Sequence, residues 1–399
     1  MSVHSDAYAA STQPEVTARL TVYLVAVGAF ALGMASYVTA GLIPMIQTAF
    51  TIPVEAAAQL VTAFTLAYGL GSPLIVAFLP GRYQRAGLLA ALGLFVLANA
   101  ASALATELSW LLALRSLAGV GSGVYLAMGI AVCATLSPPA KRGKAIAIIM
   151  GGMASGTVLG VPLSLLLAER LGWASAFWLV AALGLSALAG LAWRLPKLPT
   201  AATIPLGRKL ALLADGRVLA ILTVSLLAAI GSLGMYTFIA PFLAEPEHGA
   251  IRSIAPYLWV WGLGGVAGSF LIGPLADRMR GPALTLAIML CLTFALMSLP
   301  LAASMHPWLA VLPIALWGAV GWALQVPQNN ELIRTREAQG DGNFAVALNE
   351  SALYLGSAIG AAGGGLILLM GLPLSSLAVA AGTVGAVGAL VQLTNMRRH

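Results

Sequence analysis

Charged residues are scarce in this chain. Only 8% of its 399 residues are Asp, Glu, Lys or Arg, and 60% are hydrophobic. Ordinary soluble domains are about a quarter charged, so this composition excludes them and predicts a membrane protein. The net charge of +7 does not indicate nucleic-acid binding, because the basic residues form small groups between apolar runs and no basic face.

Cysteine and histidine are also rare. Cys133 and Cys291 lie inside apolar segments of different halves, so we interpret them as packing residues and expect no disulfide. The four histidines lie in tails and loops at unrelated spacings, so no metal site is expected. A nucleotide-binding loop and a cluster of nucleophile and base are also missing. We expect no cofactor and no enzyme activity.

The polar N-terminal segment lacks the pattern of a cleaved signal. Its first eighteen residues contain Asp6 and Glu15 and lack a basic region followed by a short apolar core. No cleaved signal is expected.

Apolar segments of about 20 residues, the length that crosses a bilayer core, recur along the whole chain. Their Ala, Leu and Gly content favours close-packed helices over barrel strands, which alternate polar and apolar residues. The predicted class is an all-α membrane protein. We expect twelve transmembrane helices, near residues 21–48, 57–79, 86–105, 109–136, 145–168, 173–195, 218–243, 254–276, 283–304, 308–332, 344–368 and 373–394.

The loops predict the orientation, because cytoplasmic loops collect Lys and Arg near helix ends. With the N-terminus in the cytoplasm, Arg170 and Arg252 are the only basic loop residues on the outer side. Trp110, Trp173 and Trp308 then stand at the outer ends of helices, as interfacial anchors do. Both termini are expected in the cytoplasm.

The longest polar connection divides the chain into two units. We expect a cytoplasmic tail over 1–20, a six-helix bundle over 21–195, a cytoplasmic linker over 196–217, a second six-helix bundle over 218–394 and a cytoplasmic tail over 395–399.

Matched glycines indicate that the two halves are related. "GTVLGVP" places Gly156 and Gly160 four residues apart in the fifth span, and "GSAIG" places Gly356 and Gly360 likewise in the eleventh. Small residues at this spacing let helix backbones approach closely. We expect these glycines, together with Pro162, to serve helix packing and gating. A parallel repeat of this kind predicts a binding site between the halves near the midplane.

Four motifs carry a resemblance to a known family. They are "GPLADR" from Gly273, "RSLAGVGSG" from Arg115, "GTVLGVP" from Gly156 and "YTFIAP" from Tyr236. Through them the chain resembles the major facilitator superfamily, and within it the bacterial twelve-span drug, sugar and nucleoside efflux proteins. The resemblance implies the major facilitator fold, with two pseudo-symmetric six-helix bundles, in a bacterial inner membrane.

The chain departs from the family pattern at two places. Gly81 stands where the first half would carry a loop aspartate, so we expect the latch role, in which such an aspartate meets the positive end of a helix in the other half, only for Asp277. Ser36 stands in the first span where many relatives carry a carboxylate. Their proton site therefore does not transfer to this chain.

Glu350 is the clearest acidic residue within a span. It lies about 9 Å into the eleventh span from its cytoplasmic start, at 1.5 Å per residue. A carboxylate at this depth could take up and release a proton during a transport cycle. The alternative is a local hydrogen bond near a wet helix end, with no role in transport.

Arg115 enters the fourth span from the outer side at a similar depth, and the resemblance places that span beside a central cavity. We expect Arg115 to face a water-accessible path, where it could attract an anionic group or act on a nearby acid in a charge relay with Glu350 and Asp277. The alternative is a buried arginine that binds backbone carbonyls and pins the structure.

The tenth span mixes aromatic and amide side chains, and its helical spacing places Trp317, Gly321 and Gln325 on one face. Aromatic and thioether side chains suit amphipathic organic molecules, although each is also a common packing residue. The candidate substrate-cavity residues are Tyr37, Arg115, Tyr125, Met128, Tyr236, Trp317, Gln325 and Tyr354.

Together these features predict a secondary active transporter that exports a small amphipathic organic solute in exchange for protons by alternating access, as a monomer in lipid. An uptake symporter or an uncoupled facilitator is an alternative, favoured by the missing acid in the first span. A receptor or scaffold on the same fold, which moves no solute, is the alternative from another class. The motifs do not identify the solute.

Overall fold

The computed structural model describes residues 3–79, 81–138, 141–196, 198, 212, 214–337 and 342–398, without the side chains of 3–18, 77, 81, 277, 343 and 398. Twelve of its helical segments are long and apolar enough to cross a membrane. Each overlaps one predicted span, so the all-α class and the number of spans are confirmed. Most of the predicted linker lies outside the described residues.

The first six spans form the N-terminal bundle. Its segments are α1 (Val3–Phe50), α2 (Val54–Leu66), the π-helical turn η1 (Ala67–Gly71), α3 (Ser72–Phe78), the 3-10 turn η2 (Gly81–Tyr83), α4 (Gln84–Ser102), α5 (Leu108–Leu136), α6 (Arg142–Ser155), the π-helical turn η4 (Gly156–Gly160), α7 (Val161–Leu171) and α8 (Ala174–Arg194).

The last six spans form the C-terminal bundle. Its segments are α10 (Gly216–Ala244), η5 (Pro246–His248), α11 (Ala255–Arg278), α12 (Gly281–Met305), η6 (Pro307–Ala310), α13 (Val311–Ala323), α14 (Gln325–Thr335), α15 (Gly342–Leu369) and α16 (Ser375–Arg398). The tenth span is divided at Leu324 into α13 and α14. Pro327 follows this break and has no N–H to donate to Ala323.

Proline also accounts for the two π-helical turns. Pro73 follows η1 and Pro162 follows η4, each by two residues. A proline ring in a regular helix meets the carbonyl four residues earlier, and a wider turn relieves that contact. The sequence therefore places a local widening in the second and in the fifth span.

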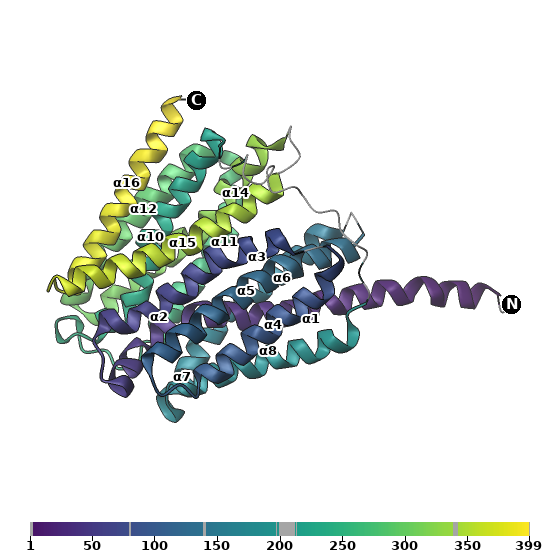
Figure 1. Cartoon of the computed structure of the whole chain (residues 1–399). Coiled ribbons are helices and arrows are strands. Elements are labelled where there is room, and N and C mark those ends of the chain that lie inside the picture. Colours follow the sequence, from purple (N-terminus) through teal and green to yellow (C-terminus); the bar gives the residue numbers. More distant parts are fainter. Residues whose placement is uncertain are drawn as a thin grey trace.

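The two bundles converge at one face of the molecule. Both chain ends lie on the opposite side, where the ribbons of the bundles diverge (Figure 1). We call the side of the chain ends the terminal face and the other side the far face. Near the far face the Ser253 hydroxyl donates to Glu169 at 2.7 Å, and α2 packs along α15. The bundles are therefore joined at the far face.

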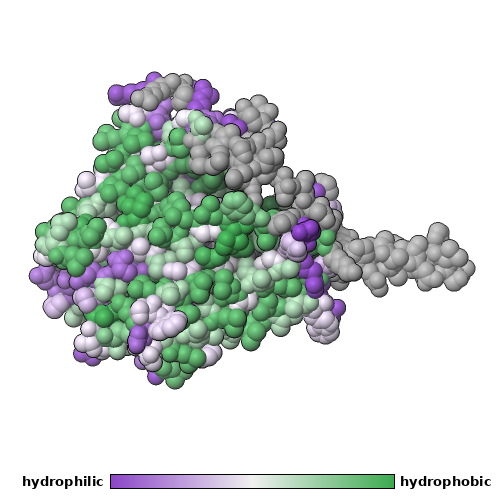
Figure 2. Space-filling model, in the orientation of Figure 1, coloured by the Kyte–Doolittle hydropathy of each residue, from purple (hydrophilic) through white to green (hydrophobic). Residues whose placement is uncertain are grey.

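Hydrophobic residues cover most of the visible surface of both bundles, and hydrophilic residues gather near helix ends (Figure 2). Large apolar side chains such as Leu97, Phe270 and Phe294 are exposed in the chain alone. This is the surface that a bilayer core requires.

The matched glycines lie at close helix crossings in both bundles. A Cβ on Gly156 would overlap the Phe30 carbonyl oxygen of α1, and one on Gly356 would lie 2.6 Å from the Ala229 Cβ of α10. Gly160 meets Met34 and Gly360 meets Gly234 in the same two crossings. The fifth span packs on the first as the eleventh packs on the seventh, which is the relation expected of a repeat.

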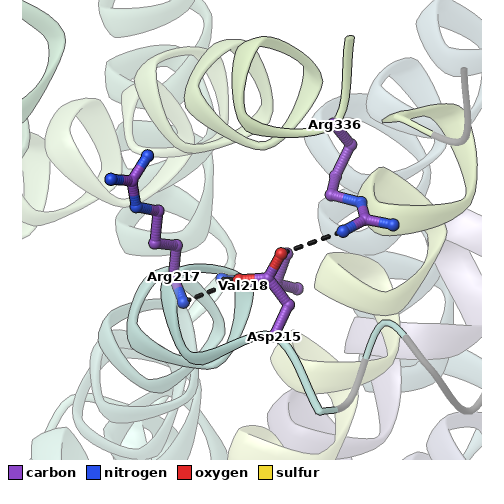
Figure 3. A network of polar contacts seen from close by, with 4 residues as sticks. All are labelled: Asp215, Arg217, Val218 and Arg336. Atoms are coloured by element: carbon purple, nitrogen blue, oxygen red, sulfur yellow. Dashed lines mark hydrogen bonds and ion pairs between the residues drawn. The ribbon is translucent and has the colours of Figure 1, made fainter. Parts of the chain in front are cut away.

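An acidic cap begins the C-terminal bundle (Figure 3). The Asp215 carboxylate accepts from the backbone N–H groups of Arg217 and Val218 at 2.9 and 3.4 Å, and from the Arg336 guanidinium at 2.9 Å. Partial burial opposes ionisation, but these backbone donors and Arg336 lower the pKa of Asp215 below its ordinary value. The cap joins the start of α10 to the end of α14.

Candidate functional site

A cavity of about 240 Å³ lies between the two bundles. One wall comes from α1, α6 and η4, and the other from α10 to α15. It lies between the two halves, where the sequence predicts the binding site. We call it the central cavity.

Glu350 supplies the only carboxylate among the described residues that line the central cavity. It lies eight residues after the start of α15, about 12 Å along the helix at 1.5 Å per residue. Within the described part of the chain its side chain has no hydrogen bond or ion pair. Glu350 therefore lines the cavity without a polar partner in the part of the chain that the structure describes.

Aromatic rings from four spans line the same cavity. They are Tyr37 of α1, Trp261 of α11, Trp322 of α13 and Tyr354 of α15. The Trp261 ring centroid lies 5.8 Å from both Tyr37 and Trp322. The Trp261 indole N–H is buried and has no hydrogen-bond partner among the described residues. Sequence reasoning did not select Trp261, because an apolar helix rich in Trp and Gly gives no sign of which face turns inward.

Gln325 also lines the central cavity, together with Ser232, Thr157 and Ser269. Trp317 lies behind this wall, where its indole N–H donates to the Ser232 hydroxyl at 2.7 Å. Its side chain is 1% exposed and does not line the cavity. Trp317 thus supports a cavity residue, and Gln325 faces the cavity itself.

Four tyrosines meet where the two bundles contact each other beside the central cavity, and we call them the tyrosine gate: Tyr37, Tyr68, Tyr236 and Tyr354. Tyr68 of η1 stacks on Tyr354 with centroids 3.5 Å apart, and Tyr37 meets Tyr236 edge-on at 5.3 Å. Each pair joins one residue of the N-terminal bundle to one of the C-terminal bundle.

Ser36 and a small void complete the gate region. The hydroxyls of Ser36 and Tyr354 are hydrogen-bonded at 3.3 Å. Beyond them lies a void of about 10 Å³, lined by Thr65, Thr237 and Ser357 among others. Ser36, the residue that stands in place of a family carboxylate, is therefore part of the contact between the bundles.

Among the other predicted cavity residues, Tyr236 lines the small void and not the central cavity, and Tyr125 and Met128 lie elsewhere. The Tyr125 hydroxyl donates to the Val25 carbonyl at 3.1 Å and is fully buried between α5 and α1. Met128, 5% exposed, packs against Gly87 of α4. Neither lines the central cavity, because the side of α5 that carries them turns into the N-terminal bundle.

Arg115 also lies away from the cavity, contrary to the expectation that it faces a water-accessible path. Its side chain is fully buried and donates to the Asn99 amide oxygen at 3.1 Å and to the Ala35 carbonyl at 2.9 Å. The guanidinium carbon lies 4.5 Å from the Phe64 ring centroid and 5.2 Å from that of Phe177. These partners hold the charge inside the N-terminal bundle. This geometry fits the alternative interpretation, in which a buried arginine binds a backbone carbonyl and pins the structure.

Asp277, the remaining member of the predicted charge relay, belongs to α11 by its backbone. Its side chain lies outside the described residues. The structure brings Glu350, Tyr37, Gln325 and Tyr354 together at one cavity and places Arg115 apart from them.

Comparison with known proteins identifies the family. The family model of the Major Facilitator Superfamily matches residues 25–360. The chain belongs to this superfamily. It is accordingly a membrane transporter and not an enzyme, as the sequence predicted.

Individual members of the Major Facilitator Superfamily align over nearly the whole chain. "Inner membrane transport protein YdhP" of Escherichia coli O157:H7 is 30% identical, covering 94% of this chain and 95% of that protein. "Chloramphenicol resistance protein" of Streptomyces lividans is 32% identical, covering 86% and 87%. Among solved structures, the nucleoside transporter NupG (D323A mutant) matches with a TM-score of 0.75 at 12% identity, covering 94% and 99%.

Proposed function

We propose that this protein exports a small amphipathic organic solute in exchange for protons, by alternating access of the central cavity to the two faces. It acts as a monomer in a bacterial inner membrane, with the terminal face in the cytoplasm. The observation that carries the proposal is Glu350, which lines an aromatic cavity between the two bundles and has no hydrogen bond or ion pair with any described residue.

The charge state of Glu350 supplies a physical basis for coupling. Sealing an ionised carboxylate away from water costs free energy unless a proton or another positive group neutralises it. The cavity therefore changes from opening to one face to opening to the other only when Glu350 is neutralised. When the cavity is empty and Glu350 is ionised, the cavity stays open to water. This rule links the movement of the bundles to the binding of a proton or of the solute.

The relatives support the direction and the membrane. One relative is named as an inner membrane transport protein and another as a chloramphenicol resistance protein, which fits export of a small organic compound. The tyrosine gate supports a cavity that opens first to the terminal face, since its rings join the two bundles across the cavity.

Proteoliposomes test the coupling. With candidate solutes, we expect the wild type to move solute against its gradient when a pH difference is imposed. We expect Glu350→Gln to lose this proton-driven transport and to retain solute exchange at equal pH. Glu331→Gln is the matched control, because Glu331 of α14 does not line the cavity. Proton-driven transport by Glu350→Gln at the wild-type rate would contradict the assignment of Glu350.

An uncoupled facilitator is the second candidate, and Ser36 favours it. A hydroxyl takes the place of the family carboxylate and is engaged with Tyr354. A facilitator would equilibrate solute at a rate independent of the pH difference in the same vesicles.

A further inference from the structure

The lining of the central cavity is asymmetric in charge. Among the described residues that line it, one carries a carboxylate and none is Lys, Arg or His. The other ionisable side chains among the described lining residues are Tyr37 of α1 and Tyr354 of α15, and Tyr68 of η1 stacks on Tyr354. A tyrosine hydroxyl carries no charge at neutral pH. The described lining thus offers one carboxylate, which is negative when ionised, and no basic side chain.

The aromatic rings around this carboxylate favour an organic cation, in which a positive group is attached to an apolar skeleton. Trp and Tyr rings attract a positive group within about 6 Å of the ring centroid, and tryptophan does so most strongly. Four such rings line the cavity, two of them indoles. An anionic solute would meet Glu350 with no positive partner, which is unfavourable in a partly dehydrated site.

The size of the cavity restricts the solute further. At about 240 Å³ it is somewhat smaller than the usual small-molecule site of about 300–1,000 Å³. This volume suits a solute of one or two fused rings.

On this basis, and resting on the proposed function, we infer that the central cavity binds small organic monocations, with the aromatic rings around the solute and its positive group at Glu350. The solute and the proton then compete for one carboxylate. Binding of the monocation to protonated Glu350 releases one proton, so one full exchange moves no net charge across the membrane.

Three flat bicyclic probes of similar size test the inference: 1-methylquinolinium, neutral 1-methyl-2-quinolone and anionic 1-naphthoate. Binding to the purified full chain is measured by calorimetry. We expect the cation to bind at least tenfold more tightly than either of the others, and more tightly as pH rises until Glu350 is ionised. We expect Glu350→Gln to remove this preference and Glu331→Gln to retain it.

The comparison of probes on the wild type keeps the test decisive even if Glu350→Gln does not fold. Equal or tighter binding of the quinolone or the naphthoate would overturn the inference, as would cation binding by folded Glu350→Gln at the wild-type affinity.

Flux in proteoliposomes separates the two proposals. Export of a neutral or anionic solute without cation binding would overturn the cation inference and leave the proposed function standing. Cation binding without flux of any probe would support the cation site and contradict the proposed function.

Discussion

Tyr68 and Tyr354 stack face to face, with ring centroids 3.5 Å apart and planes inclined by 14°. Tyr68 belongs to the N-terminal bundle and Tyr354 to the C-terminal bundle, so the pair bridges the two moving parts. Because η1 is a π-helical turn, the position of Tyr68 depends on the widening that precedes Pro73. This contact joins the two bundles beside the central cavity.

Replacing Tyr354 with Ala should weaken the closed gate. Aromatic pairs contribute about 0.5–1.5 kcal/mol beyond the area they bury. We expect Tyr354→Ala to favour opening toward the far face, measured as faster thiol labelling of a cysteine placed at Thr237 in the small void. Tyr354→Phe keeps the stack, loses the Ser36 hydrogen bond and serves as the control. Equal labelling in the Ala variant and the wild type would argue against the gate.

Asn99 should stabilise the fold by accepting a hydrogen bond from Arg115. Asn99→Leu removes an acceptor and leaves a buried guanidinium donor unpaired, which costs about 1–3 kcal/mol. We expect a lower melting temperature for Asn99→Leu, and partial recovery in the double variant Asn99→Leu, Arg115→Met, because an apolar pair can replace a buried polar one.

The same variants separate the two interpretations of Arg115. If Arg115 acts only as a structural pin, the stable double variant retains transport. Loss of transport in a folded, stable Arg115→Met protein would instead support the charge-relay hypothesis, in which the sequence places Arg115 with Glu350.

The matched glycines allow a controlled test of packing. A Cβ on Gly156 would overlap the Phe30 carbonyl, whereas a Cβ on Gly151 or Gly363 meets nothing within 4 Å among the described residues. Overpacking costs about 1–3 kcal/mol. We expect Gly156→Ala and Gly356→Ala to lower the melting temperature, and Gly151→Ala and Gly363→Ala to leave it unchanged or raise it. A stable Gly156→Ala would show that α1 can move away from η4.

Asp215 should give an acid-dependent contribution to stability. Its pKa is lowered in the folded chain, so the contribution is complete above the ordinary carboxyl pKa and is lost as pH falls through the lowered value. A helix cap contributes about 1 kcal/mol. We expect Asp215→Ala to lower the melting temperature at pH 7 and to have a smaller effect near pH 3. Asp215→Asn keeps a capping oxygen, so its melting temperature at pH 7 should lie between those of the wild type and Asp215→Ala. A difference in melting temperature between the wild type and Asp215→Ala that does not change with pH would contradict this prediction.

The orientation can be tested with two exposed positions. In a protein lacking Cys133 and Cys291, Arg252→Cys lies in the connection before α11 at the far face and Lys144→Cys near the start of α6 at the terminal face. We expect an impermeant thiol reagent added to intact cells to label the cysteine at 252 and leave that at 144 unlabelled until the cells are permeabilised. The reverse pattern would place the termini outside.

Residues that lipid would reject could be found from the sequence, but their surroundings could not. Glu350 is conspicuous in an apolar span, and it does line the central cavity. Arg115 is equally conspicuous, yet Asn99, Ala35, Phe64 and Phe177 enclose it. The difference depends on which face of α5 turns toward α1 and α4, and an apolar helix carries no polar stripe that would show it.

The sequence by itself determined the class, the twelve spans and the glycine crossings, because hydrophobic length and small-residue spacing act locally along each helix. Only the tertiary structure decided which side chains share the central cavity. Trp261 meets both Tyr37 and Trp322 there through the packing of spans far apart in sequence, while Tyr125 and Met128 turn into their own bundle. In lipid every face of a helix is apolar, so the contacts between helices alone fix which face turns inward.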